Sequence, residues 1–180
     1  MKKNRLIALL MIVALAFAGL VYGAACAEEP PETDEDFPLR ALELLEPGVT
    51  SYAAGLMQAR LLQLGYFEGP LDSTLTEETI EALRAFQAQN GMDPDGAATP
   101  DIQRALLGEG AVSAAGEALP AFDPVADLPD GCFIGNLNTH KFHCLDCPSV
   151  GEMKDKNKRI LTSRDLAEDG GFVPCQRCNP

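Results

Sequence analysis

The stretch MQARLLQLGYFEGPLDSTLTEETIEALRAFQAQNGMDPDG, residues 57–96, decides the fold. Its apolar residues recur at helical spacing in two blocks, which predicts amphipathic helices over about residues 53–64 and 77–90. Gly65 and Gly91 follow these blocks, and glycine commonly ends a helix. Thr76 is a suitable N-cap for the second helix, since two glutamates follow it in the first turn.

A third helix is predicted to begin at Thr99-Pro100, where an N-cap residue precedes proline at the first helical position. Four large apolar residues of the first two helices are expected to form the core: Leu61, Leu64, Leu83 and Phe86. Three short helices joined by loops that turn at Gly and Asp predict a small all-α domain over residues 47–107.

Residues 47–107 resemble the peptidoglycan-binding domain family, whose pattern is LQxxLxxLGY, an acidic DG-type loop, TxxAVxxFQ and a second DG. The matching positions are Met57-Gln58, Leu61, Leu64-Gly65-Tyr66, Asp72, Thr79, Ala82-Leu83, Phe86-Gln87 and Asp95-Gly96. Ser73 stands where the family has its first loop glycine, and Thr99 and Ile102 replace a later Gly and Thr. The resemblance implies a three-helix fold that binds cell-wall peptidoglycan.

Polar groups at helix ends and in loops are the groups that can hydrogen-bond a glycan or its peptides. The candidate peptidoglycan-binding residues are Tyr66, Asp72, Thr79 and Gln87. Two of them have an alternative interpretation, in which Gln87 satisfies backbone groups of the adjacent loop and Thr79 caps its helix locally.

The tail, residues 131–180, holds five of the six cysteines and both histidines, mainly in FHCLDC (142–147) and CQRC (175–178). We expect strands at 132–136 and 158–161 and a short capped helix at 163–169. A domain of this size buries little apolar area and usually needs disulfides, a metal or a partner to fold.

His143-x3-Cys147 and Cys175-x2-Cys178 bring together three thiolates and one imidazole, which is a closed ligand set for structural Zn²⁺. Disulfides are the alternative, because they are common outside the cytoplasm. A Cys175–Cys178 bridge, however, would give His143 no role.

Two further cysteines, Cys132 and Cys144, lie twelve residues apart outside this ligand set. They are a candidate disulfide pair if paired strands bring them face to face, and free thiols if not. His140 lies next to the motif at the wrong spacing and is expected to be a solvated loop residue.

Residues 132–180 also resemble the metal-binding domain of Ada-type DNA-repair proteins and of relatives appended to competence proteins and secreted nucleases. The positions that carry this resemblance are Gly135-Asn136, Thr139, Lys141-Phe142-His143, Cys147, Asn157, Ala167, Gly171-Phe172, Pro174-Cys175, Cys178 and Pro180. The resemblance implies the metal site. It does not carry over methyl transfer, because His143 occupies the position of the methyl-accepting cysteine.

Residues 1–27 have a basic start, an apolar run and small residues, as in a signal peptide cleaved after Ala27. Lipidation of Cys26 and an uncleaved membrane anchor are alternatives. Residues 28–46 are predicted to be an acidic, disordered spacer, and residues 108–130, rich in Ala, Gly and Pro, a disordered linker.

Residues 28–130 carry four Lys/Arg against 21 Asp/Glu, which argues against nucleic-acid binding by that part. The sequence thus predicts an α+β protein in which a three-helix domain precedes a small zinc-stabilised α+β domain. The function inferred is that of an exported, non-catalytic peptidoglycan-binding protein whose tail binds a partner, with another exported protein as the candidate. Two alternatives are a nucleic-acid-associated accessory role, prompted by the basic stretch KDKNKR (154–159), and thiol–disulfide exchange by Cys175 and Cys178.

Overall fold

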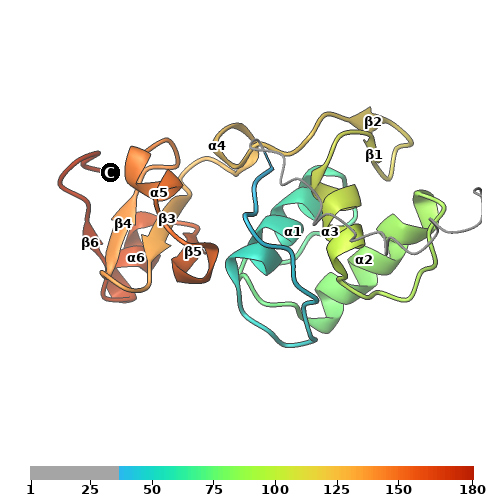
Figure 1. Cartoon of the computed structure of the whole chain (residues 1–180), viewed down its shortest axis with the longest axis horizontal. Coiled ribbons are helices and arrows are strands. Elements are labelled where there is room, and N and C mark those ends of the chain that lie inside the picture. Colours follow the sequence, from blue (N-terminus) through green and yellow to red (C-terminus); the bar gives the residue numbers. More distant parts are fainter. Residues whose placement is uncertain (1–36) are drawn as a thin grey trace, which may run out of the picture. The chain divides into compact units, whose positions relative to one another are not determined.

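The computed structural model describes residues 37–180 (Figure 1). The predicted signal peptide and residues 28–36 of the predicted spacer lie outside these described residues. Residues 37–46 of the spacer are described and differ from the expected disordered segment, since Leu39 is buried in the core and Leu45 forms a β-bridge with Ala98. The fold is a mixture of helices and strands, as predicted. None of the helices in residues 37–180 is long and apolar enough to cross a lipid bilayer.

Three helices form the first part of the described chain: α1 (Tyr52–Gln63), α2 (Glu77–Gln89) and α3 (Pro100–Leu107). Each begins at a hydroxyl residue whose side chain accepts a hydrogen bond from the backbone N–H three residues on. These N-caps are Ser51, Thr76 and Thr99. Such caps satisfy donors that have no partner inside the helix. The prediction of three helices, with Thr76 and Thr99 as N-caps, is therefore confirmed, whereas the cap at Ser51 was not predicted.

Helix α1 is buried on two faces. Met57, Leu61 and Leu64 pack with α2 and α3, as predicted. A second stripe at the same helical spacing, Tyr52, Leu56 and Ala59, belongs to a different apolar cluster. That cluster includes residues of the tail: Cys132, Ile134, Met153 and Ile160. The helical domain and the tail therefore share a hydrophobic core.

Residues 108–130 differ from the expected disordered linker. They contain a small hairpin of β1 (Ala111–Val112) and β2 (Ala118–Leu119), followed by α4 (Pro124–Asp127). Phe122 and Leu128 are buried against α1. Arg60 of α1, which is fully buried, donates hydrogen bonds to the carbonyls of Leu106 (3.0 Å) and Pro120 (2.6 Å). These contacts explain the order of a segment that has no helical period.

The tail is a four-stranded sheet in the order β5-β3-β4-β6. Its strands are β3 (Phe133–Asn136), β4 (Lys141–His143), β5 (Lys158–Leu161) and β6 (Val173–Pro174). Strand β3 is antiparallel to β4 and β5, whereas β4 and β6 are parallel. The predictions for β3, β5 and the helix α6 (Arg164–Asp169) agree with the structure, while β4, β6, α5 (Pro148–Gly151) and the 3₁₀ helix η1 (Asp155–Asn157) were not expected.

Gly55 lies in α1 where the tail comes closest. A Cβ added there would lie 2.6 Å from Ser73 Oγ and 2.9 Å from Ile160 Cδ1. Glycine inside a helix ordinarily costs about 0.5–1 kcal/mol relative to alanine. Its presence here is explained by the close approach of Ser73 and of Ile160 in the tail.

We expect Gly55→Val to lower the free energy of unfolding by about 1–3 kcal/mol, because overpacking would outweigh the gain in helix propensity. Gly151→Val in α5 is the control, since nothing lies within 4 Å of a Cβ added there. Denaturant unfolding of both variants provides the measurement. A Gly55→Val protein as stable as the control would contradict the proposed close packing of α1 on the tail.

Candidate functional site

His143, Cys147, Cys175 and Cys178 converge in the tail. His143 ends β4, and Cys147 directly precedes α5. Strand β6 runs parallel to β4 with Phe142 opposite Pro174, so Cys175 lies beside His143. The N–H of Cys175 donates to the carbonyl of Phe142 at 2.9 Å. The sheet thus joins the two halves of the predicted ligand set across a long stretch of chain.

The geometry of these four residues fits one metal ion. Their ligand atoms all lie within 4.8 Å of one another. Nδ1 of His143 is 3.6 Å from Sγ of Cys147. Two ligands of one tetrahedral Zn²⁺, at usual Zn–N and Zn–S distances, would be about 3.6 Å apart. The structure therefore supports a metal site, and the donor set of three sulfurs and one imidazole suits Zn²⁺.

The surroundings of these ligands affect their protonation. Burial lowers the pKa of His143, and the nearby charge of Lys141 lowers it further, which favours the neutral imidazole that a metal requires. Burial would raise the pKa of Cys175, but hydrogen bonds from the backbone N–H groups of Cys178 and Arg177 and from neighbouring thiols leave it lowered. Burial, with these thiols, raises the pKa of Cys178 to about 12. Cys175 therefore ionises more readily than Cys178.

The proposed disulfide between Cys132 and Cys144 is not formed. All five cysteines in residues 37–180 are free thiols. Strands β3 and β4 pair Ile134 with His143. Continuing this register puts Cys132 opposite Leu145, one residue away from Cys144, and a shift of one residue turns a side chain to the other face of a sheet. Cys132 lies instead in the core shared with α1.

The loops of the helical domain are held by two glutamines in an equivalent way. Gln58 donates to Asp72 Oδ1 at 2.8 Å and accepts from the N–H of Ser73 at 2.9 Å. Gln87 donates to Asp95 Oδ1 at 2.8 Å and accepts from the N–H of Gly96 at 2.7 Å. Hydrogen bonds from the N–H of Ala97 and the Gln87 amide hold the pKa of Asp95 below its usual value. Both acidic loops are therefore anchored to a helix by the same pair of bonds.

The four candidate peptidoglycan-binding residues lie in different places. Thr79 and Gln87 are buried, and their polar groups bond within the domain. The hydroxyl of Tyr66 donates to the carbonyl of Val112 at 2.8 Å. Asp72 is exposed, and it is linked to Thr79 by the side-chain amide of Gln58, which donates a hydrogen bond to each of them. Of the four, Asp72 is the one most accessible to a ligand.

Sequence reasoning did not single out Gln58 as a loop anchor. The signal was present, because Gln58 and Gln87 both precede an acidic loop turn. It also did not place the basic residues 154–159 beside α1, since no local pattern reports a contact between segments about a hundred residues apart.

Residues 51–106 match the family described as putative peptidoglycan binding domain. The comparison with families identified no Ada-type domain in the tail, so that resemblance stays a prediction. No curated protein and no solved structure matched the chain. The matched region contains α1, α2 and nearly all of α3.

We expect Ser73→Gly to raise the free energy of unfolding by about 1 kcal/mol. Ser73 has φ of 62°, and its buried hydroxyl has no hydrogen-bond partner within residues 37–180. A left-handed non-glycine residue and an unsatisfied buried hydroxyl are each destabilising. Ser73→Ala, which removes only the hydroxyl, separates the two effects by denaturant unfolding. A Ser73→Gly protein less stable than the wild type would refute this account of the loop.

Proposed function

We propose that the protein is an exported, non-catalytic protein that binds cell-wall peptidoglycan through its helical domain. The observation that carries this proposal is the match of residues 51–106 to the putative peptidoglycan binding domain. Peptidoglycan lies outside the cytoplasmic membrane, which agrees with the signal peptide expected at residues 1–27. The anionic character of residues 28–130 is also compatible with a partner other than nucleic acid.

The tail, in this proposal, is a structural zinc module. Zn²⁺ bound by His143, Cys147, Cys175 and Cys178 would cross-link β4, the start of α5 and the C-terminal turn, and would contribute its binding free energy to folding. All four ligand positions come from the chain, as in structural rather than catalytic zinc sites. A further exported protein remains the partner we propose for this module.

Thiol–disulfide exchange has less support than metal binding. A redox pair needs only Cys175 and Cys178, and the lowered pKa of Cys175 would suit it. The convergence of Cys147 and His143 on the same point, however, has no role in such an exchange, whereas a metal site requires it.

We expect the whole protein to sediment with purified cell-wall sacculi at low salt and to be released by soluble muropeptides. The whole chain is the appropriate sample, because removing the tail would expose the second apolar face of α1. Protein that stays in the supernatant would overturn the proposed function.

A matched pair of variants tests whether Asp72 contributes to this binding. Asp72→Asn keeps an oxygen that can accept from Gln58 and Thr74 but removes the charge. We expect about three- to tenfold weaker retention if the wall contacts this carboxylate. Asp95→Asn is the control, since Asp95 makes the equivalent internal bonds in the other loop.

We expect one zinc ion per chain, with chelation unfolding the tail, because zinc sites in small domains supply roughly 10 kcal/mol or more of folding free energy. Loss of a residue that hydrogen-bonds to a metal ligand typically weakens metal binding by roughly 10–100-fold. Because His143 is itself a proposed ligand, His143→Ala should weaken zinc binding by more than this. His140→Ala, in an exposed turn, should retain full zinc affinity. Elemental analysis and chelator competition measure both variants.

The zinc assignment would be wrong if the purified protein held no metal and mass spectrometry found the tail cysteines in disulfides. Equal loss of zinc from the His140 and His143 variants would also contradict it, since only His143 lies in the cluster.

A further inference from the structure

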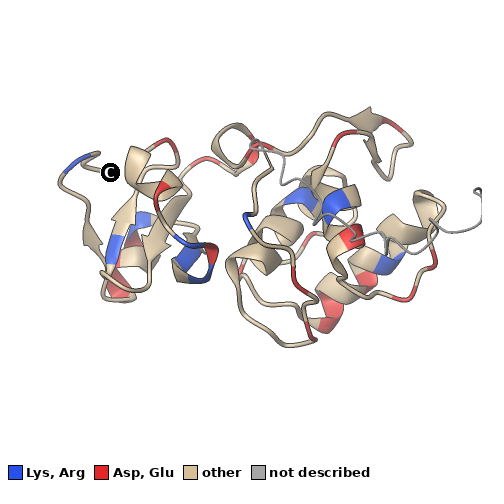
Figure 2. Cartoon of the chain, in the orientation of Figure 1, with Lys and Arg blue, Asp and Glu red and all other residues tan. Residues whose placement is uncertain are grey.

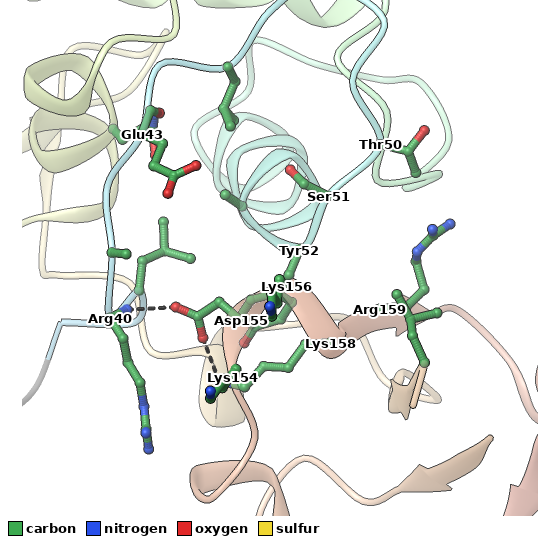
Figure 3. A pocket seen from close by; sticks show the side chains of 16 residues that line it. Arg40, Glu43, Thr50, Ser51, Tyr52, Lys154, Asp155, Lys156, Lys158 and Arg159 are labelled. Atoms are coloured by element: carbon green, nitrogen blue, oxygen red, sulfur yellow. Dashed lines mark hydrogen bonds and ion pairs between the residues drawn. The ribbon is translucent and has the colours of Figure 1, made fainter. Parts of the chain in front are cut away.

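A cavity of about 470 Å³ lies between the helical domain and the tail (Figure 3). Three segments line most of it: residues 39–45, the start of α1, and residues 154–159. Gln103 and Leu137 complete the lining. Its volume falls within the range of small-molecule sites, roughly 300–1,000 Å³. The basic segment lies outside the matched residues 51–106, so the cavity is not a feature of the matched domain alone.

The cavity is positively charged in a chain whose formal net charge is −13. Its lining includes five basic residues against two acidic ones: Arg40, Lys154, Lys156, Lys158 and Arg159 against Glu43 and Asp155. Figure 2 shows basic residues gathered at η1 and β5. Such a local concentration of positive charge favours an anionic ligand.

Four of these five basic side chains have no ionic partner within residues 37–180. Lys158 pairs with Asp155 at 2.9 Å, and the backbone N–H of Arg40 donates to the same carboxylate at 2.7 Å. Asp155 is therefore already engaged. The guanidinium of Arg40 donates to the carbonyl of Gly151 and makes no ion pair. Lys154, Lys156 and Arg159 make no ion pair in this part of the chain either.

The side chain of Arg159 also lacks a hydrogen-bond acceptor within the described residues. Its Nε is buried without a hydrogen-bond partner among the described residues. The side chain extends from β5 toward Thr50, beside the start of α1 (Figure 3). A buried donor without an acceptor costs free energy, so this position of Arg159 is not explained by the protein's own hydrogen bonds. The terminal amino groups of the guanidinium are not buried in this way and have no partner within residues 37–180, which leaves them available to an anion in the cavity.

The start of α1 adds backbone donors to the same wall. Ser51 caps the helix by accepting from the N–H of Ala54. Within residues 37–180, the N–H groups of Tyr52 and Ala53 have no acceptor. The beginning of a helix also carries partial positive charge. The helix start therefore reinforces the preference that the basic residues create.

Apolar side chains form the rest of the cavity, among them Leu39, Leu45 and Leu137. A ligand that matches both the basic and the apolar side of the cavity has a negatively charged group next to a small apolar one. The end of a peptidoglycan stem peptide has this chemistry, since an alanyl end joins a carboxylate to a methyl group.

We propose that this cavity binds the carboxylate end of a peptidoglycan stem peptide, with Lys156 and Arg159 contacting the carboxylate. The inference rests on the proposed function and adds to it. The helical domain and the tail together form this peptide site, which neither part contains alone.

The test compares two double variants of the whole zinc-loaded protein. Lys156→Gln with Arg159→Gln removes two charges from the cavity. Arg84→Gln with Arg104→Gln removes two charges from partly exposed positions outside it. Affinity for a soluble disaccharide–tetrapeptide is measured by calorimetry, and retention on sacculi by sedimentation. Zinc content and circular dichroism verify that both variants fold.

We expect the cavity variant to bind the muropeptide at least about tenfold more weakly than the wild type, and the control to stay within about twofold. Amidating the peptide carboxylates should weaken wild-type binding to the same extent. Stripping phosphate polymers from the sacculi should leave it unchanged.

Equal binding by the two double variants, or wild-type binding that survives amidation, would overturn the inference while leaving wall binding intact. Loss of binding on phosphate removal alone would assign the cavity to a phosphate group and refute the carboxylate assignment. A wild type that binds neither muropeptide nor sacculi would refute the proposed function and this inference together.

Discussion

Burial of helix α1 on two faces is the constraint on which the rest of the structure depends. One face completes the three-helix core, and the other, with Tyr52 and Leu56, completes a core with Ile134 and Ile160 of the tail. Gly55 between them lets β5 come close. Since neither core is complete without this helix, we infer that unfolding of the tail lowers the stability of the helical domain as well.

The tail has few apolar contacts of its own. Apart from the core that it shares with α1, it has one small cluster of buried residues within the described chain: Phe142, Ala167 and Phe172. Four short strands and a cluster this small would be marginal alone. Packing on α1 through β3 and β5 supplies part of the missing stability, and the proposed Zn²⁺ beside β4 and β6 would supply more. The packing of the tail on α1 also places the basic segment 154–159 beside this helix. The cavity between the helical domain and the tail is a consequence of this packing.

Much of the fold followed from local patterns. The helices were predictable because hydroxyl caps, glycine stops and apolar spacing are encoded within about a dozen residues. The cluster of His143, Cys147, Cys175 and Cys178 was predictable because metal chemistry restricts the residue types and spacings of a ligand set. The candidate wall-binding residues were less predictable: Thr79 and Gln87 carry polar groups in loop-forming motifs, yet the structure uses those groups to hold its own loops. A motif shows that a polar side chain is needed and leaves open whether its partner is a ligand or the protein.

The sequence by itself determined three amphipathic helices, two of the tail strands and the set of three sulfurs and one imidazole. The tertiary structure alone decided that Cys132 and Cys144 do not face each other, because the register of β3 and β4 is set over the whole hairpin. It also decided that Arg60 is buried and that Arg159 lies beside the start of α1. These outcomes depend on packing between segments that are distant in the chain. A short stretch of sequence contains only one of the two packing surfaces, so it cannot show how favourable their contact is.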